Sequence, residues 1–456
     1  KNVLNKLCVA LFGMALSLSF VSCDPPIVID PKDETVITED IVTDTEWTSD
    51  KVYLLDDQFI YVKNNATLTI QAGTVIKGTG KGALIITRGA KIMAVGTPSN
   101  PIVFTSNKAK GERNYGDWGG LVILGKATTN KADDGVPGQG KPEGGIQGYY
   151  GGTDDDDNSG VLRYVRIEFA GIPLSTESNS EINGLTLYSV GRGTTIDHIQ
   201  VSYCGDDSFE WFGGTVNCQY LVSYRAWDDD LDTDNGYSGN VQFGLVIRDP
   251  KISDQSGSNA FESDNNASGT ADAPKTKAKF ANVTAYGPIA STDTTGFDPA
   301  KKYQSALHLR RNTDIEVYNS VFIGFREGLR TWDSKTPANN AVMKGCIFAQ
   351  IPENKYFNNL VTPTAGKEDT KAYAQRFVDG LEYADKASLN LTYFNQQAGQ
   401  NVTLSNLVPQ TGSPLLTSGV ATPASMSVTA DYVGAFKDNT NWLNGWTNFN
   451  PQQTDY

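Results

Sequence analysis

The residues of this sequence best suited to chemistry are acids that recur beside apolar residues between positions 197 and 266. Residues 206–210 (DDSFE) align with residues 228–232 (DDDLD), and residues 261–265 (FESDN) align with residues 231–235 (LDTDN). The copies return every ~20 to 30 residues, which is the range of solenoid repeats. If each copy forms one coil of a solenoid, the acids of successive coils stack into a column on one face.

The same alignment predicts that bases continue this column. Aligning the segment SALHLRRN on FESDN places His308 at the Glu262 position and Arg310 at the Asp264 position. The later segment GLRTWD adds Arg330 at the next position. Read along one face, the predicted column is Glu210, Asp232, Glu262, His308 and Arg330.

Stacked carboxylates repel one another, because strands paired in register lie only about 4.8 Å apart. A bound cation would relieve this repulsion, and calcium prefers about six to eight oxygen ligands. The sequence therefore predicts a calcium site. Its candidate ligands are Asp206, Asp207, Asp228, Asp229, Asp230, Asp232 and Asp234.

The same residues are suited to cleaving a polysaccharide. Carboxylates on neighbouring or next-nearest coils reach the separation of about 5 to 9 Å that glycoside hydrolysis uses. Crowding raises the pKa of one carboxyl, as a general acid requires. A lyase needs a base and cationic groups that stabilise negative charge, which His308 and the arginines supply. Candidate catalytic residues are Glu210, Asp232, Glu262, His308, Arg310 and Arg330.

Ligand binding without catalysis is the leading interpretation of these residues. The candidate ligand-binding residues are Trp211, Trp227, Asp264 and Arg330, with the two indoles stacking on sugar rings. A purely structural interpretation also exists, because ion-pair networks place charges in the same way. In that case the acids form ladders with turn amides, and Arg225, Arg248, Arg310 and Arg330 balance their charge.

Short β-strands must position these residues. Apolar residues alternate with period two in segments such as Ile199, Val201 and Tyr203, which is typical of strands. Glycine, asparagine and aspartate at the breaks tolerate the backbone of tight turns. Because one coil cannot bury its inner face alone, we predict an all-β parallel β-helix. We also make two finer alignments of repeated strands: residues 201–203 align with residues 222–224, and residues 68–76 align with residues 84–92.

Composition narrows the classes of function. The chain has 456 residues, of which 39% are hydrophobic, so a large core is possible. Its net charge of −14 argues against nucleic-acid binding, which requires a basic face. Cys204 and Cys218 are close enough in sequence to pair in an oxidising compartment, or they are buried thiols.

The N-terminus predicts export and lipidation. Lys1 and Lys6 precede an apolar run that is too short to span a membrane and fits a secretory signal. The run ends in FVSC, where Cys23 would become the acylated first residue; an ordinary cleaved signal with a chance cysteine is the alternative. We expect a lipid anchor in the outer membrane, at the cell surface or on the periplasmic side.

We predict four regions along the chain. These are a signal peptide at 1–22, an acylated cysteine and flexible acidic tether at 23–50, the β-helix at 51–350, and last coils with a short helix and an aromatic cap at 351–456. Residues 127–158 form an excursion from the coil, and the four aspartates at 154–157 either bind calcium or are solvated. The helix is expected within residues 368–386, and Trp442, Trp446 and Phe449 form the cap or a sugar platform.

Several segments resemble a known family. They are ATLTIQAGTVIKG, GTPSNPIVFTS, WGGLVILGKA, GDDSFEWFGG, WDDDLDTDNG and VGAFKDNTNWLNGWTNF. They look like secreted or lipid-anchored right-handed β-helix proteins of Bacteroidetes-type bacteria. This resemblance covers nearly all of the mature chain and implies a fold but no activity. The architecture is more distantly similar to pectin-lyase-like lyases and hydrolases, which use carboxylates on one sheet face, often with calcium and basic residues. No motif of theirs matches closely enough to transfer residue roles.

Together these features predict a surface-anchored lipoprotein that binds a glycan or similar polymer along an acidic-to-basic face, with calcium as a candidate cofactor. A polysaccharide lyase or glycoside hydrolase is the alternative, and a structural or adhesive surface protein is the second. An outer-membrane transporter is a further expected partner.

Overall fold

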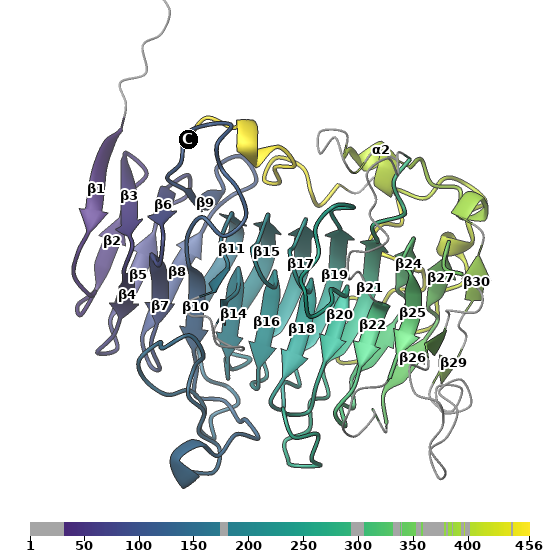
Figure 1. The fold of residues 1–456 in the computed structure, drawn as a ribbon, viewed down its shortest axis with the longest axis horizontal. Coiled ribbons are helices and arrows are strands. Elements are labelled where there is room, and N and C mark those ends of the chain that lie inside the picture. The colour runs from purple at the N-terminus through teal and green to yellow at the C-terminus, as the bar shows by residue number, and fades with distance from the viewer. Residues whose placement is uncertain are drawn as a thin grey trace, which may run out of the picture. The chain divides into compact units, whose positions relative to one another are not determined.

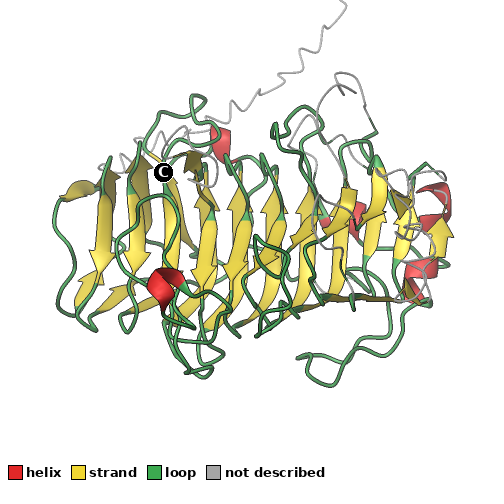
Figure 2. Ribbon diagram, turned by 60° about the horizontal axis from the view of Figure 1, so that its bottom comes forward, coloured by secondary structure: helices red, strands yellow, loops and turns green. Residues whose placement is uncertain are grey.

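The computed structural model describes residues 32–173, 181–292, 305–331, 338, 340–352, 357–358, 378–379, 382–384, 386–393, 396, 402–438 and 441–456. In this part of the chain nearly all regular structure is β, and the strands pair in parallel as successive rungs of stacked sheets (Figures 1 and 2). The predicted all-β parallel β-helix is therefore confirmed.

The described residues form a smaller sheet of ten strands and a larger sheet of eighteen strands. The smaller sheet contains β4 (Phe59–Val62), β7 (Ala83–Ile86), β10 (Gly120–Leu124), β14 (Leu185–Tyr188), β16 (Phe209–Phe212), β18 (Leu231–Asp234), β20 (Phe261–Ser263), β22 (Ser305–Leu309), β25 (Glu327–Arg330) and β28 (Phe357–Asn358). The larger sheet contains β1 (Asp33–Ile37), β2 (Thr45–Trp47), β3 (Lys51–Asp56), β5 (Thr67–Ile70), β6 (Val75–Thr79), β8 (Lys91–Val95), β9 (Ile102–Ser106), β11 (Gly160–Glu168), β15 (Thr195–Ser202), β17 (Asn217–Tyr224), β19 (Asn240–Ile247), β21 (Lys279–Tyr286), β23 (Glu316–Tyr318), β24 (Val321–Ile323), β26 (Val342–Lys344), β27 (Ile347–Ala349), β29 (Val378–Asp379) and β30 (Glu382–Ala384).

The remaining elements are short. β12 (Ile172–Pro173) and β13 (Glu181–Ile182) form a separate hairpin-like pair. The helices are η1 (Asp133–Gly135), η3 (Lys386–Leu389), α2 (Leu404–Leu407), η4 (Pro414–Leu416) and η5 (Pro451–Gln453). None of the described helices has the length and apolar character needed to cross a bilayer.

The central strands of the larger sheet bend at one position in each coil. Tyr164, His198, Tyr220, Phe243 and Asn282 all have positive φ values, between 51° and 64°, which are uncommon for residues other than glycine. Rings at this position stack from coil to coil, with centroids 4.4, 4.4 and 5.0 Å apart along the first four residues. Stacking thus offsets part of the backbone strain, and the bend gives each coil an additional face.

The interior is filled by the inward residues of both sheets, and Trp211 is one of them. Its side chain has no exposed area and stacks on Tyr237 at 5.4 Å. The prediction that Trp211 binds a ligand is therefore wrong. Side chains alternate across a strand, so a residue next to the outward Glu210 must point inward.

Both finer alignments are also wrong. Val201 pairs with Ser223 rather than Val222, so this coil repeats at the same spacing as the acids that follow it. Leu68 pairs with Ile92, whereas Leu84 belongs to the smaller sheet. Each coil has several similar strands, and a short pattern match cannot tell a neighbouring coil from another face of the same coil.

The coil begins earlier than we predicted. β1 pairs with β3 and β2 pairs with β5, so ordered strands occupy part of the region expected to be a tether. The side chains of β1 are mostly exposed because it is an edge strand, and its acidic composition therefore resembles that of a linker. The signal sequence and Cys23 lie outside the described residues.

The C-terminal region differs from the prediction in two ways. β29 and β30 lie within the stretch expected to be helical and pair with β26 and β27; residues 368–377 lie outside the described part. The aromatic residues do not cap the end of the coil. Residues 441–456, here called the C-terminal strap, run back across the larger sheet, and the C-terminus lies near β9 (Figure 1).

The strap is held by packing and by hydrogen bonds. The ring centroid of Trp446 lies 5.5 Å from that of His198, and the Trp442 ring lies 5.4 Å from that of Tyr220. At its end the Tyr456 hydroxyl bonds the fully buried Glu168 at 2.6 Å. The aromatic residues therefore cover a side of the coil, where strand side chains rather than open edges need burial.

The remaining local expectations concern cysteines and the excursion. Cys204, Cys218 and Cys346 are buried free thiols, so the disulfide alternative is wrong.

In the excursion, Asp155 accepts a hydrogen bond from the Thr128 backbone amide at 3.0 Å, and Asp157 accepts one from the Lys126 backbone amide at 3.0 Å. These aspartates act as turn-stabilising acceptors.

Candidate functional site

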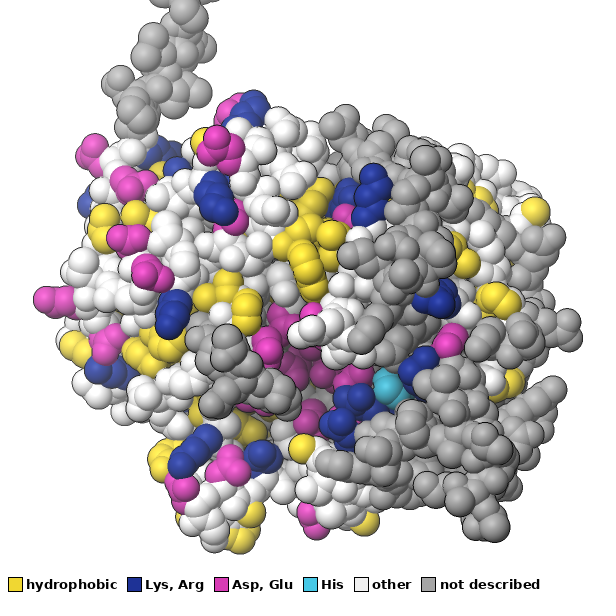
Figure 3. All heavy atoms as spheres, viewed as in Figure 1, with side chains coloured by type: hydrophobic (Ala, Val, Ile, Leu, Met, Phe, Trp, Pro, Cys, Tyr) yellow, Lys and Arg dark blue, Asp and Glu magenta, His cyan; other side chains and the backbone are white. Residues whose placement is uncertain are grey.

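The outer face of the ten-stranded sheet carries the predicted column. Strand pairing sets Glu210 beside Asp232, Asp232 beside Glu262, Glu262 beside His308, and His308 beside Arg330. The register inferred from sequence is thus confirmed for all five residues. We call this surface, from Glu210 to Arg330, the acidic-to-basic face. In Figure 3 its acids lie in a hollow, with histidine and basic side chains to one side.

A second outward column runs parallel to the first. Phe212 pairs with Asp234, and the backbone amides of Asp264 and Arg310 continue the ladder by bonding Thr233 and Ser263. The second column therefore changes from the apolar Phe212 to acids and then to a base along the coil, while the first column changes from acids to bases. The charge gradient belongs to the face as a whole rather than to one row of side chains.

The acids form two groups that share Asp207. One contains Asp206, Asp207 and Asp228, the other Asp207, Glu210 and Asp232, and within each group the candidate ligand oxygens lie within 4.8 Å of one another. Among the described residues, no ion pair joins a basic side chain to Asp207, Glu210 or Asp232. The buried Oδ1 atoms of Asp228 and Asp232 have no hydrogen-bond partner in the described structure. The charges of these carboxylates are therefore only partly balanced: Asp207 accepts from the Asp229 backbone amide at 2.7 Å and Asp228 from the Ser256 hydroxyl at 3.1 Å, but no arginine or lysine is ion-paired to the group around Asp207 in the described residues.

Their acidity reflects this environment. Poor access to water, followed by the charge of Asp234, raises the pKa of Asp232 to about 7. Burial, and then Asp232, raises the pKa of Asp229 to about 8. Burial and neighbouring acids also raise the pKa values of Asp207 and Glu210 well above their ordinary range. At neutral pH some of these groups hold a proton unless a cation replaces it.

Asp230 does not belong to this group. Its carboxylate bonds Arg248 at 3.0 Å and Ser223 at 2.5 Å, and the Asp230 and Arg248 side chains are almost fully buried. Arg248 also donates to the carbonyl oxygens of Asp228 and Asn259, at 2.5 and 3.1 Å. The prediction of Asp230 as a calcium ligand is wrong because its charge is already matched inside the coil.

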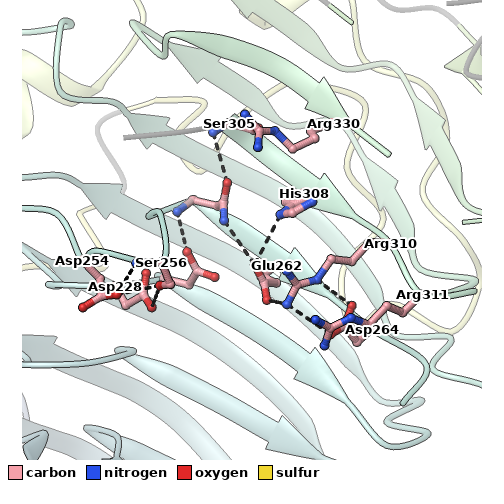
Figure 4. Close-up of polar contacts among 12 residues, drawn as sticks. Asp228, Asp254, Ser256, Glu262, Asp264, Ser305, His308, Arg310, Arg311 and Arg330 are labelled. Carbon is pink, nitrogen blue, oxygen red and sulfur yellow. Dashed lines mark hydrogen bonds and ion pairs between the residues drawn. The ribbon is translucent and has the colours of Figure 1, made fainter. Parts of the chain in front are cut away.

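The basic end of the face is internally paired (Figure 4). Arg310 bonds both Glu262 and Asp264, and Arg311 bonds Asp264 at 2.7 Å. His308 Nδ1 lies 3.4 Å from Glu262. Arg330 donates to Glu327, a residue of its own strand, at 2.6 Å. The structural interpretation therefore holds for Glu262 and Asp264, but it does not extend to the acids around Asp207.

Three residues near the acids were missed by sequence reasoning. Glu143 comes from the excursion, and burial followed by Asp234 raises its pKa to about 7. Asn183 donates a hydrogen bond to Glu210. Thr186 pairs with Glu210 in the column, is 2% exposed, and its hydroxyl has no partner in the described structure. Extending the column by one coil would have found Thr186, whereas loop residues carry no such periodic signal.

Of the two predicted tryptophans, only Trp227 reaches the surface. It is partly exposed, precedes Asp228 in the sequence, and packs edge-on against Tyr115 with ring centroids 5.4 Å apart. An aromatic ring beside a carboxylate group is the arrangement that sugar binding uses, since the ring covers the apolar sugar face while carboxylates accept hydroxyl protons.

Comparison with known proteins identifies the fold. Residues 37–447 match the family model described as a pectate-lyase like beta helix domain. Among solved structures, the catalytic domain of a GH87 alpha-1,3-glucanase variant in complex with tetrasaccharides is similar over 74% of this chain and 70% of that chain, with 11% identity and a TM-score of 0.24. No characterised protein sequence matches the chain. The activity must therefore be argued from the site.

Proposed function

Because the chain belongs to the family defined by the pectate-lyase-like β-helix domain, we propose that its acidic-to-basic face binds a polysaccharide bearing uronate groups. One observation carries the proposal: carboxylates that lack an ion-pair partner among the described residues and a row of arginine side chains share one hollow face in register. Carboxylates accept hydrogen bonds from sugar hydroxyls, and Arg310, Arg311 and Arg330 attract the uronate charges.

Calcium is part of the proposal. The carboxylate oxygens of Asp207, Glu210 and Asp232 converge. The buried Oδ1 atom of Asp232 has no hydrogen-bond partner in the described structure, which suits an atom that would bind a metal ion. Oxygen donors of this kind suit calcium. The ion would remove the repulsion among the acids and present free coordination positions to hydroxyl or carboxylate groups of the sugar. Asp206 and Asp228 would complete the site on the next coil edge.

Cleavage of the bound polymer is the second candidate. Glu210 and Asp232 are direct neighbours, and a carboxyl with a pKa of about 7 can donate a proton at neutral pH. Because the two carboxyls repel each other's charge, one of the pair would keep its proton and act as the acid, while the other would ionise and act as base or nucleophile. Binding is the conclusion we prefer, because ion pairs hold the guanidinium groups of the basic end in fixed orientations, and a guanidinium stays protonated and so presents N–H donors rather than transferring protons.

The test compares polygalacturonate and alginate with neutral glucans in calcium and in EDTA. We expect calcium-dependent binding of a uronate polymer that weakens at least tenfold in Asp232→Asn and in Arg311→Ala. Asp156→Asn is the matched control, because it removes a carboxylate that is 78% exposed. Equal binding by the wild-type protein and all three variants would refute the proposed site. New reducing ends or unsaturated products would establish the catalytic alternative.

We also propose that the domain is tethered through a lipid on Cys23 at the outer membrane, where a transporter would be its partner. The motif FVSC at residues 20–23 supports this. Labelled fatty acid should enter the protein expressed with its leader in a Gram-negative host, and Cys23→Ser should abolish labelling and release the protein from membranes. Labelling that persists in Cys23→Ser would refute the anchor.

A further inference from the structure

The two outward columns of the ten-stranded sheet do not stay open beyond the acids. From Glu210 the first column continues through Thr186 and Val122 to Ile85, which are 2%, 0% and 0% exposed. From Asp234 the second column continues through Phe212, Tyr188 and Leu124, which are 3%, 2% and 1% exposed. The outer surface is thus closed on the coils that precede the acids.

Side chains of the excursion help to fill this part of the face. Ile146 and Tyr150 join the outward apolar residues in a second hydrophobic cluster, separate from the main core. The Tyr150 ring lies 4.8 Å from the Tyr188 ring, which in turn stacks on Phe212 at 4.5 Å. We call the cluster formed by these residues the wall.

The wall is fixed in place at both ends. The Gln147 amide donates to the Tyr61 hydroxyl at 3.0 Å. On the other side Asn130 donates to the carbonyl oxygens of Asn265 and Pro274, at 2.7 and 3.1 Å, and so reaches the coils that carry the acids. Figure 1 shows the excursion as the blue loops below β10 and β14. A firmly bonded excursion is therefore a boundary of the site.

From this closure we infer that the acidic end of the face receives a chain end of the polysaccharide, and not an internal segment. The inference rests on the proposed function. A polymer lying along the columns advances by one strand spacing, about 4.8 Å, per coil. From Arg330 to Glu210 it crosses four spacings, roughly 19 Å, and the next step would bring it onto Thr186 and Val122, which are covered.

The chemistry at the closed end suits a terminal sugar. A terminal unit carries a free hydroxyl where an internal unit carries a glycosidic oxygen, so it has one more hydrogen-bond donor. Glu210 and Asp207 offer carboxylate acceptors there, and the excursion adds the carboxyl of Glu143, whose backbone amide donates to the Tyr188 hydroxyl of the wall at 3.1 Å. The buried Thr186 hydroxyl, which has no partner in the described structure, lies at the next column position. Acceptor oxygens thus lie where the additional hydroxyl donor of a terminal sugar would arrive.

The experiment measures competition by galacturonate chains of increasing length against a labelled galacturonate oligomer. Chain-end recognition predicts that a chain ten times longer competes ten times less well per uronate unit and equally well per chain. Binding of internal segments predicts equal potency per uronate unit. Tyr150→Ala opens the wall, so the potency of the long polymer per uronate unit should rise several-fold, towards the value expected for binding of internal segments. The neighbouring Tyr149→Ala, at a position that is 37% exposed, should not.

The outcomes are distinguishable. If long and short chains compete equally well per uronate unit for the wild-type protein, chain-end recognition is overturned and the proposed function stays intact. If no galacturonate or alginate chain shows calcium-dependent binding, both proposals are overturned. If Tyr150→Ala is folded and keeps the wild-type length dependence, the wall is not the boundary and the inference fails. Should that variant not fold, the wild-type length series decides alone.

Discussion

The crowded carboxylates predict that the cation-free protein loses stability as the pH rises. A carboxyl with a raised pKa keeps its proton in the folded state when the unfolded chain has already lost it. The stability that this carboxyl contributes is therefore fully present below its pKa in the unfolded chain. It is lost as the pH rises through the pKa of the carboxyl in the folded state. For Asp232 that window runs from its ordinary value of 3.8 to about 7.

The size of this effect follows from proton linkage. One extra proton held by the folded state changes the free energy of unfolding by about 1.4 kcal/mol per pH unit, or about 2.7 kcal/mol between about pH 5 and pH 7. Unfolding entropy is about 2 cal/mol/K per residue, which gives ~0.8 kcal/mol/K for about 400 folded residues. Each such proton therefore corresponds to a fall in Tm of about 3 °C.

Calcium should reverse the loss. A ligand at ~100-fold above its Kd stabilises the folded state by about 2.7 kcal/mol, again about 3 °C on the same entropy scale. The gain should be present near neutral pH and absent near pH 5, because protons then occupy the carboxylates that would bind the ion. Asp232→Asn should remove the calcium gain and flatten the pH dependence.

The assay is thermal unfolding across this pH range in EDTA and in calcium. Asp156→Asn is the matched control, because it also removes one negative charge but at an exposed position of the excursion. The comparison thus cancels the general effect of lowering a net charge of −14. A Tm in EDTA that is constant or rises between pH 5 and 7 would refute the reasoning. So would an equal calcium gain in the Asp232→Asn protein.

Three further predictions test the supporting structure. Arg248→Met leaves Asp230 buried without its partner and should cost about 3 to 5 kcal/mol in chemical unfolding, whereas a loss below 1 kcal/mol would show that the pair is dispensable. Tyr456→Phe removes the strap's bond to Glu168 and should cost about 1 to 3 kcal/mol, with faster proteolysis of the C-terminus; unchanged proteolysis would contradict the strap. Trp227→Ala should weaken uronate binding and leave Tm within a degree or two, while Trp211→Phe should lower Tm by creating a cavity and leave binding unchanged; the opposite pattern would reverse their assignments.

Sequence reasoning succeeded where one strand pattern recurs beside a chemical group. The acid follows an apolar residue in β16, β18 and β20, so the register of Glu210, Asp232 and Glu262 was predictable. The same alternation should have placed Trp211 inside, because it is adjacent to an outward residue. A short match such as residues 68–76 on 84–92 failed because the faces of one coil resemble one another.

Other parts of the site could not be found from local pattern. Glu143 lies in a loop, and it meets Asp234 only because the excursion folds back over the sheet. The strap aromatics contact rings more than 200 positions earlier in the chain, and nothing in their spacing says which coil they cover. Contacts of this kind are set by how the coils are arranged in space and not by the local sequence.

The contrast among the acids of the same coils is the strongest argument that Asp207, Glu210 and Asp232 have a function. The protein balances Asp230 with Arg248, and it balances Asp264 with Arg310 and Arg311. Two like charges about 4 Å apart repel by roughly 4 kcal/mol at an effective dielectric constant of about 20. Within the described part of the chain, the fold pairs these neighbouring acids with arginine, whereas no ion pair joins a base to Asp207, Glu210 or Asp232, so the cost of repulsion falls on this group. Strained electrostatics of this kind concentrate at sites that bind or react. We therefore propose that a cation, together with the ligand it holds, supplies the balancing positive charge.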